Sequence, residues 1–368
     1  MSNIMIVLDG LQDITYPELN GKTPYDWGKG ENFKKIEAAC AKGTLATTPA
    51  GFEPDTQACI LTLLGVHARD IPSGRSYIEA LAVGVPVGFD DIVMRCNFVT
   101  VTPDGILDDP TCSAPEDIAK TLREAVASVP DNSITPVGSY KSLQVIKDGG
   151  IYAGSLKTYP PHNYAGKPFE SLLPSGNELA DSLAQMSREL LKKYAPYTVL
   201  NWAQAVPCAL PSFSSLHRGM TGGMVTATHA PMGCAAAMSM ACPEIPAATG
   251  DTDTDLAAKA EAALALAKTC DFVMVHIGGP DEATHRKNAR EKAEFVRKLD
   301  TELIAPILNR CTGKTRIMIT CDHVALCSTG GHTAEPVGFM LYEKGGTLSG
   351  ELPEHDGKEA VEIMIKFK

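Results

Sequence analysis

The stretch Asp271-Phe-Val-Met-Val-His-Ile-Gly-Gly-Pro-Asp-Glu-Ala-Thr-His285 decides the fold of this chain of 368 residues. Its first seven residues form an apolar run that ends at two glycines and a proline, and such a run predicts a buried strand of an α/β sheet. Asp281 and His285 follow that strand directly. Because ligands and catalytic groups in α/β sheets gather at the carboxyl ends of the strands, we expect a functional site here.

Two further elements of the same kind follow. Asp322 and His323 come after the apolar run 316–320, and His332 precedes the apolar run 336–341. Carboxylate and imidazole groups together suit zinc, manganese or iron, whereas sites built only from oxygen ligands suit magnesium and calcium. A single Asp-His pair can simply cap a turn, but three such elements so close together favour a metal site.

Length and composition exclude several classes of protein. A chain of 368 residues is long enough for two domains, or for one core with a large insertion. The net charge of −11 disfavours nucleic acid as a partner, and no apolar run is long enough for a membrane span. The eleven scattered cysteines lack CxxC spacing, which predicts reduced thiols and a cytoplasmic location. An anionic substrate remains compatible with this charge, because a local cluster of cations can dominate its own site.

The N-terminal segment predicts another strand of the sheet. The apolar run 4–8 ends at Asp9 and Gly10, so it reads as a first strand and not as a signal peptide. Asp9 is a further candidate ligand, and Gly10 permits a tight turn beside it. The apolar spacing in the segment 32–43 predicts a helix that ends at Gly43.

A helix that follows a loop rich in proline and glycine contains the candidate nucleophile. The loop covers residues 49–56, and the apolar segment 57–64 predicts a helix whose N-cap is Thr56. The start of a helix offers backbone N–H groups and a partial positive charge to a phosphate. An N-cap hydroxyl is usually structural, but beside bound metals the Thr56 hydroxyl becomes a candidate nucleophile.

Together these parts resemble the alkaline phosphatase superfamily, and more closely the archaeal-type 2,3-bisphosphoglycerate-independent phosphoglycerate mutases. The resemblance covers most of the chain and rests on the order Asp, hydroxyl, Asp-x-x-x-His, Asp-His, His. Other matching segments are Leu8-Asp-Gly, Glu18-Leu-Asn-Gly-Lys-Thr-Pro24, Leu63-Leu-Gly65, Ser73-Gly-Arg-Ser-Tyr-Ile-Glu-Ala-Leu-Ala-Val-Gly84, Arg95-Cys-Asn-Phe98, Pro160-Pro-His162, Gly166-Lys-Pro168 and Ala248-Thr-Gly250.

The resemblance implies two divalent metal ions, manganese or zinc ahead of magnesium, iron or cobalt. One ion would be held by Asp281, His285 and His332. The second would be held by Asp9, Asp322, His323 and the hydroxyl of Thr56, which is also the implied catalytic nucleophile. Two ions about 3.5–4 Å apart can clamp the attacking and leaving oxygens of an in-line displacement.

The resemblance also implies an α/β fold with an alkaline-phosphatase-like core, in which a mostly parallel sheet is flanked by helices. Residues 1–87 and 196–368 would form this metal-binding core, and residues 88–195 an inserted, smaller α+β lid that recognises the substrate. The candidate substrate-binding residues are basic: Arg75, Arg95, Lys141 and His162.

The recognition residues depart from the family pattern, whereas the metal ligands do not. Thr56-Gln57 replaces a serine followed by an acid, and Asn163 replaces an aspartate after His162. Lys141 stands where relatives have an arginine, so the bidentate fork that suits phosphate and carboxylate is lost. The family's Trp-Gly-Gln-Gly is here Trp202-Ala-Gln-Ala205.

The expected function is therefore metal-dependent phosphoryl transfer through phospho-Thr56. By resemblance it is the glycolytic interconversion of 3-phosphoglycerate and 2-phosphoglycerate, with a small anionic phosphorylated metabolite as substrate. Two alternatives stay open. The first is a hydrolase or mutase of the same superfamily that acts on another small phosphate, phosphonate or sulfate ester. The second is a non-catalytic protein that binds metal or metabolite. The sequence does not predict an oligomeric state.

Overall fold

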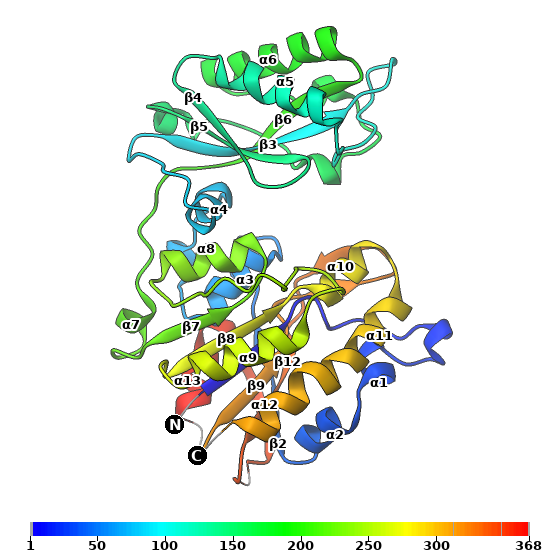
Figure 1. The fold of residues 1–368 in the computed structure, drawn as a ribbon, viewed down its shortest axis with the longest axis vertical. Coiled ribbons are helices and arrows are strands. Elements are labelled where there is room, and N and C mark those ends of the chain that lie inside the picture. The colour runs from blue at the N-terminus through cyan, green and yellow to red at the C-terminus, as the bar shows by residue number, and fades with distance from the viewer. Residues whose placement is uncertain (1–2, 312, 347, 367–368) are drawn as a thin grey trace. The chain divides into compact units, whose positions relative to one another are not determined.

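The computed structural model of the protein describes residues 3–311, 313–346 and 348–366. The chain divides into two compact units (Figure 1). The first consists of Met1–Ile71 and Leu210–Lys368, and the second is the continuous segment Pro72–Ala209. Within the described residues, no helix combines the length and the apolar character needed to cross a membrane.

The first unit is built on a seven-stranded sheet with the order β13-β2-β12-β9-β1-β8-β7. All its neighbouring strands are parallel except β12, which runs antiparallel to β2 and β9. This confirms the predicted mostly parallel α/β sheet. The strands are β1 (Asn3–Leu8), β2 (Cys40–Ala46), β7 (Gly222–Val225), β8 (Phe272–Ile277), β9 (Arg316–Thr320), β12 (Val337–Glu343) and β13 (Gly350–Asp356).

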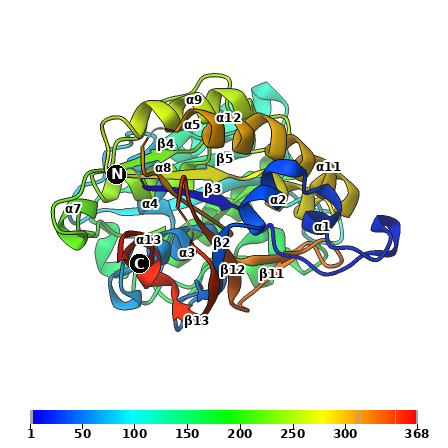
Figure 2. The same cartoon turned by 90° about the horizontal axis from the view of Figure 1, so that it is seen from below.

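Helices cover both faces of this sheet (Figure 2), which explains why its central strands are apolar throughout. One face packs in a single core against α2 (Glu31–Glu37), α9 (Leu256–Leu266), α11 (Ala289–Leu299), the π-helical η6 (Asp300–Ile304) and α12 (Ala305–Arg310). The other face is covered by α3 (Thr56–Leu63), α8 (His229–Ala237) and α13 (Ala360–Lys366). The remaining elements of the unit are α1 (Pro24–Gly28), α7 (Phe213–Leu216), α10 (Gly279–His285), the hairpin β10 (Val324–Leu326) and β11 (Gly331–Thr333), and the 3-10 turns η1 (Pro17–Leu19), η2 (Ala68–Asp70) and η7 (Gly357–Glu359).

The second unit is an α+β unit with an antiparallel four-stranded sheet in the order β4-β5-β3-β6. Two amphipathic helices, α5 and α6, pack on one face of this sheet around Phe98 and Leu122. A shorter helix, α4, packs on the opposite face against Val93 and Leu143. The elements are α4 (Ser76–Ala82), β3 (Ile92–Thr100), α5 (Glu116–Ala127), β4 (Asn132–Pro136), β5 (Lys141–Ile146), η3 (Gly149–Tyr152), η4 (Pro161–Asn163), η5 (Phe169–Leu172), α6 (Glu178–Tyr194) and β6 (Tyr197–Ala205). The predicted domain boundaries, after residues 87 and 195, stay a prediction.

The predicted helix over 32–43 is wrong in its second half. Helix α2 ends at Glu37, and β2 begins at Cys40 and pairs with β12 and β13. Gly43 lies in this strand opposite Phe339, and a Cβ at Gly43 would come within 2.7 Å of the Phe339 ring. The glycine therefore makes room for a large side chain across the sheet, and this tertiary packing overrides the helical spacing.

A buried ion pair anchors the hairpin β10–β11 to the helical layer. Nζ of Lys292 in α11 donates to Oδ2 of Asp13 at 3.0 Å and to the carbonyl of Ala325 at 2.8 Å, and both charged side chains are inaccessible to solvent. Oδ2 of Asp13 also accepts the backbone N–H of Cys327, while its Oδ1 accepts the hydroxyl of Tyr16. Every charge in this network is therefore paired and hydrogen-bonded.

We expect Lys292→Met to destabilise the protein by about 3–5 kcal/mol, because it leaves the Asp13 carboxylate buried without a cation. Urea unfolding monitored by circular dichroism measures this change. The exposed Lys298 lies on the same helix, so Lys298→Met is the matched control, with an expected change within about 0.5 kcal/mol. Equal stability of the two variants would show that the buried pair does not hold the hairpin.

Candidate metal centre

Three buried aspartates meet at the carboxyl ends of three adjacent parallel strands. Asp9 follows β1, Asp322 follows β9, and Asp281 lies in α10 directly after β8. Because β9, β1 and β8 are neighbours in register, their ends reach the same edge of the sheet. The three residues are 5%, 0% and 8% exposed, respectively, so this edge concentrates negative charge out of contact with water.

The turn after β1 requires a glycine. Gly10 has a φ of +58°, and a Cβ there would lie 2.7 Å from Cβ of Ala325 and 2.8 Å from Oδ1 of Asp281. Both the left-handed backbone and the close approach exclude a side chain. The N–H of Gly10 also donates to Oδ1 of Asp322 at 3.1 Å, so this turn links the three carboxylates.

Two histidines present their Nε2 atoms to Asp281. Nδ1 of His285 donates to the carbonyl of Gly330 at 3.0 Å, and Nδ1 of His332 donates to the carbonyl of Pro54 at 3.1 Å. The Nε2 atoms of His285 and His332 each lie 3.1 Å from a different oxygen of Asp281. A backbone acceptor on one ring nitrogen is the usual arrangement for a histidine that binds a metal through the other nitrogen.

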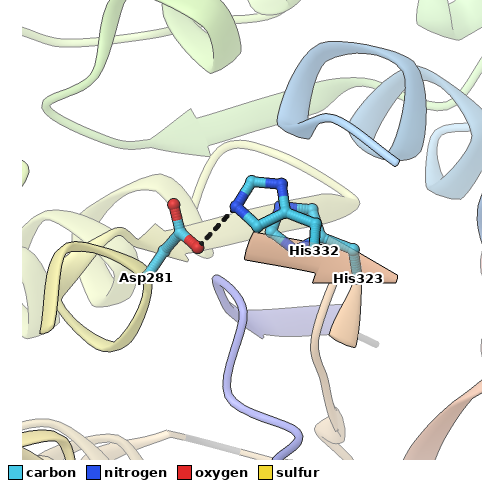
Figure 3. Close-up of side chains that lie close together, drawn as sticks. All are labelled: Asp281, His323 and His332. Carbon is cyan, nitrogen blue, oxygen red and sulfur yellow. Dashed lines mark ion pairs between the residues drawn. The ribbon is translucent and has the colours of Figure 1, made fainter. Parts of the chain in front are cut away.

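His323 completes the predicted set of side chains. Its ring stacks on that of His332, with centroids 4.0 Å apart and an interplanar angle of 21°. Its Nε2 lies 3.4 Å from Oδ1 of Asp9 and 3.5 Å from Oδ2 of Asp322. Figure 3 shows His323 and His332 side by side, with Asp281 facing them from α10.

The buried atoms of this cluster that lack a hydrogen-bond partner are donors of electron pairs. They are Oδ1 of Asp9, Oδ1 of Asp281, Oδ2 of Asp322, Nε2 of His332 and one ring nitrogen of His323, whose two ring nitrogens both lack a partner. Buried polar atoms are rarely left unpaired. Divalent cations would satisfy these electron-pair donors, so the residues fit the metal ions that the family resemblance implies.

Ligand atoms within 4.8 Å of one another form two groups. The first contains Asp281, His323 and His332, and the second contains Asp9, Asp322 and His276. This division differs from the predicted one, because His323 is grouped with Asp281 and not with Asp9. The assignment of each side chain to a particular ion stays a prediction.

The pKa shifts reflect crowding of like charges. The pKa of Asp9 is raised well above its ordinary value by burial and by the carboxylates of Asp322 and Asp281. Burial would also raise the pKa of Asp281, but the imidazoles of His285 and His332, 3.1 Å away, outweigh it and lower that pKa. The carboxylate of Asp281 raises the pKa of His285 to about 9. Positive charge is therefore favoured at this edge of the sheet.

His276 belongs to this site although its sequence context did not predict it. It is the second-last residue of β8 and is inaccessible to solvent, and its Nε2 lies 3.0 Å from Oδ2 of Asp9. Burial lowers its pKa to about 4. A single histidine inside an otherwise apolar strand was the available signal, since a buried polar side chain needs a partner.

Thr56 was predicted to be the N-cap of its helix, and this prediction is wrong. Helix α3 begins at Thr56, and the cap is Asp55, whose Oδ1 accepts the N–H of Ala58 at 3.1 Å. The carboxylate of Asp55 is the stronger cap because it also carries the charge that a helix N-terminus favours. Thr56 lies two residues after Pro54, whose carbonyl accepts the hydrogen bond that orients His332.

The four predicted substrate-binding residues lie in the second unit, and two of them share one acid. Glu79 is buried in α4, and its carboxylate pairs with Arg95 through two hydrogen bonds and with Nε of Arg75 at 2.8 Å. The guanidinium of Arg95 lies over the ring of Trp202. The ring of His162 packs edge-on against the same Trp202 ring, with ring centroids 5.2 Å apart.

Lys141 stands apart from that cluster. It begins β5, opposite Asn97 of β3, and its Nζ lies over the ring of Tyr140 at 4.9 Å. The cations of this unit were predicted from the sequence but Glu79 was not, because an acid within a helical run is typical of a solvent-exposed residue.

Comparison with known proteins identifies relatives along the whole chain. Residues 38–198 match the family described as 2,3-bisphosphoglycerate-independent phosphoglycerate mutase. A mutase of that name from Methanopyrus kandleri is 30% identical over 370 residues, which cover 92% of this chain and 87% of the relative. A second, from Methanothrix thermoacetophila, is 28% identical over 94% of this chain and 91% of the relative.

Solved structures share the fold. A protein from Pyrococcus horikoshii superposes with a TM-score of 0.75 at 22% identity, over 99% of this chain and 96% of that chain. The cofactor-independent phosphoglycerate mutase from Thermoplasma acidophilum superposes with a TM-score of 0.61 at 20% identity, over 100% of this chain and 99% of that chain. These two structures support the α/β fold.

Glu79 yields a prediction about pH. The arginines Arg75 and Arg95 outweigh burial and lower its pKa from 4.5 to about 2. A carboxylate with a depressed pKa stabilises the folded state above its unfolded pKa, and this stability is lost as the pH falls from about 4.5 through about 2. We expect Glu79→Gln to remove about 3 kcal/mol at pH 7, at about 1.4 kcal/mol per pKa unit.

Urea unfolding at a series of pH values checks this expectation. In Glu79→Gln the dependence of unfolding free energy on pH should flatten between pH 4.5 and pH 2, because the titrating group is gone. Glu124→Gln removes an exposed acid of α5 and should retain the wild-type slope. A Glu79→Gln slope parallel to that of the wild type would contradict the assigned pKa.

Proposed function

Because this chain belongs to the family of 2,3-bisphosphoglycerate-independent phosphoglycerate mutases, we propose that it interconverts 3-phosphoglycerate and 2-phosphoglycerate through a phosphorylated Thr56. The observation that carries the proposal is the set of buried, unpaired oxygen and nitrogen atoms at the ends of β1, β8 and β9. In this proposal the reaction belongs to glycolysis in the cytoplasm.

The position of Thr56 supports its role as nucleophile. It is the first residue of α3, where the backbone N–H groups and the helix dipole favour a phosphoryl group. The loop before it reaches the metal centre, since the carbonyl of Pro54 accepts a hydrogen bond from His332. Two divalent ions, manganese or zinc, held by Asp9, Asp281, His285, Asp322, His323 and His332, would lower the pKa of the Thr56 hydroxyl and neutralise the phosphoryl oxygens.

The proposed reaction has two mirror-image steps. In the first, the Thr56 hydroxyl loses its proton, its oxygen bonds to phosphorus, and the bond from phosphorus to the substrate oxygen breaks. The freed glycerate oxygen takes up a proton. In the second step, the other hydroxyl of glycerate loses its proton and its oxygen bonds to the phosphorus of phospho-Thr56. The bond from phosphorus to Oγ1 of Thr56 breaks, and Oγ1 takes up a proton. No water is consumed, so the phosphate returns to glycerate.

The second unit supplies the groups proposed to recognise the substrate. Arg75, Arg95, Lys141 and His162 would bind the carboxylate and the phosphate of phosphoglycerate. Arg95 is pre-oriented, because Glu79 holds one side of its guanidinium and Trp202 supports its face. A fixed guanidinium loses little conformational freedom when it binds an anion.

One observation favours a different small ester as substrate. Glu79 cancels one of the two charges of Arg75 and Arg95, and Lys141 offers a single ammonium group where the family resemblance implies a guanidinium. This leaves less positive charge to hold both a carboxylate and a phosphate. The metal centre would serve a hydrolase or mutase of another small phosphate, phosphonate or sulfate ester equally well.

The decisive experiment combines turnover with detection of the phosphoenzyme. Manganese-loaded protein is assayed for 2-phosphoglycerate formation in a coupled assay and for cleavage of an aryl phosphate. Thr56→Ala should lower mutase turnover by more than about 1,000-fold, because the nucleophile is lost. Thr56→Ser retains a hydroxyl and should stay active. Thr301→Ala removes an exposed threonine of the first unit and serves as the control.

The outcomes separate the candidate functions. Mutase turnover with a phosphate group trapped on Thr56 supports the proposal, whereas undiminished turnover in Thr56→Ala removes Thr56 from the mechanism. Cleavage of the aryl phosphate without phosphoglycerate turnover would show that the natural substrate is another ester. Metal binding without turnover of either compound would favour a non-catalytic binding protein.

A further inference from the structure

His276 has a partner on each ring nitrogen. It lies in β8 opposite Val7 of β1, and its Nε2 faces Oδ2 of Asp9 at 3.0 Å. On the other side of the ring, Nδ1 lies 3.3 Å from the hydroxyl of Thr226 and 3.5 Å from that of Thr228. The imidazole therefore bridges the carboxylate of Asp9 and the hydroxyls that follow β7.

The carboxylate of Asp9 determines which ring nitrogen of His276 carries the proton. An ionised carboxylate only accepts hydrogen bonds, so Nε2 carries the proton that it donates to Oδ2 of Asp9. Nδ1 is then an acceptor, and the hydroxyls of Thr226 and Thr228 are the donors within reach.

This arrangement differs from that of the neighbouring His323. Both ring nitrogens of His323 lack a hydrogen-bond partner, so a lone pair is available for a cation. Nε2 of His276 points directly at an oxygen of Asp9 and uses its proton there. A nitrogen that donates a proton cannot at the same time offer its lone pair to a metal ion.

We propose that His276 is a positioning residue for the metal ligand Asp9 and is not itself a ligand. By donating Nε2–H to Oδ2 of Asp9, it leaves Oδ1 directed at a divalent cation. Oδ1 is the Asp9 oxygen that has no hydrogen-bond partner in the described structure. The inference rests on the proposed metal centre, and it holds for any ester substrate.

An N–H donor suits this position. Asp9 shares the site with Asp281 and Asp322, and its carboxylate needs a partner that stabilises the anion and leaves the other oxygen open to a cation. Among the described residues, His276 makes that hydrogen bond to the side chain of Asp9.

The test uses metal affinity, measured by calorimetric titration of manganese into metal-free full-length protein. His276→Leu should bind manganese 10- to 100-fold more weakly, the usual cost of losing a partner that orients a ligand. His276→Gln places an amide N–H near the position of Nε2 and should restore most of the affinity. The partly buried His217 also has a hydrogen-bonded ring nitrogen, to the carbonyl of Leu64, so His217→Gln is the matched control and should bind like the wild type.

The absorption spectrum of bound cobalt(II) separates positioning from coordination. His276→Gln should keep the wild-type spectrum, because the set of ligands is unchanged. A changed spectrum together with unrestored affinity would make His276 a ligand and overturn the proposal, as would unchanged affinity in His276→Leu.

If His276→Leu does not fold, the double variant Thr226→Val/Thr228→Val replaces it in the test. Affinity for manganese should stay within about 3-fold of the wild type, because Nε2 still donates to Asp9, and the cobalt(II) spectrum of His276→Gln then decides: a spectrum that differs from the wild type would overturn the proposal. Absent phosphoglycerate turnover in wild-type protein would contradict the proposed function alone, since none of these measurements uses a substrate.

Discussion

The repulsion among three buried carboxylates is the constraint on which this structure depends. Asp9, Asp281 and Asp322 are brought to one edge of the sheet by three adjacent parallel strands, and burial denies them the screening that water provides. Charges of one sign cannot remain buried together without compensation. The protein supplies part of it through His285 and His332, and it leaves the remaining electron pairs unpaired and directed inward. A centre built in this way favours the binding of cations, and enzymes that transfer phosphoryl groups use bound metal ions.

The surrounding structure fixes these groups before any ion arrives. Gly10 lets the first turn pass beside Asp281, and the buried pair of Asp13 and Lys292 secures the hairpin that contains His332. Backbone carbonyls orient two of the histidines, while His276 holds Asp9. In the second unit a cation is fixed in the same way, because the buried carboxylate of Glu79 holds the guanidinium of Arg95. Pre-organisation of this kind reduces the entropy that binding must overcome.

The sequence predicted the features that leave a local signature. Apolar runs that end in Asp or His predicted the strands β1, β8 and β9 and brought the ligands to their ends, because a buried parallel strand must be apolar on both faces. Features that depend on distant partners were missed. Helix α2 ends early because β2 pairs with two strands from the far end of the chain. The roles of His276 and Glu79 depend on residues at least sixteen positions away, Asp9 and Arg95, so their local sequence reads as ordinary strand and helix.

The central claim is that the carboxylate oxygens and imidazole nitrogens at this edge of the sheet hold two divalent ions. Anomalous diffraction at the manganese absorption edge, from crystals grown with manganese, tests it most directly. We expect two manganese peaks, one bounded by Asp281 and His332 and the other by Asp9 and Asp322. A map without manganese between these residues, or with the ions bound elsewhere, would contradict it.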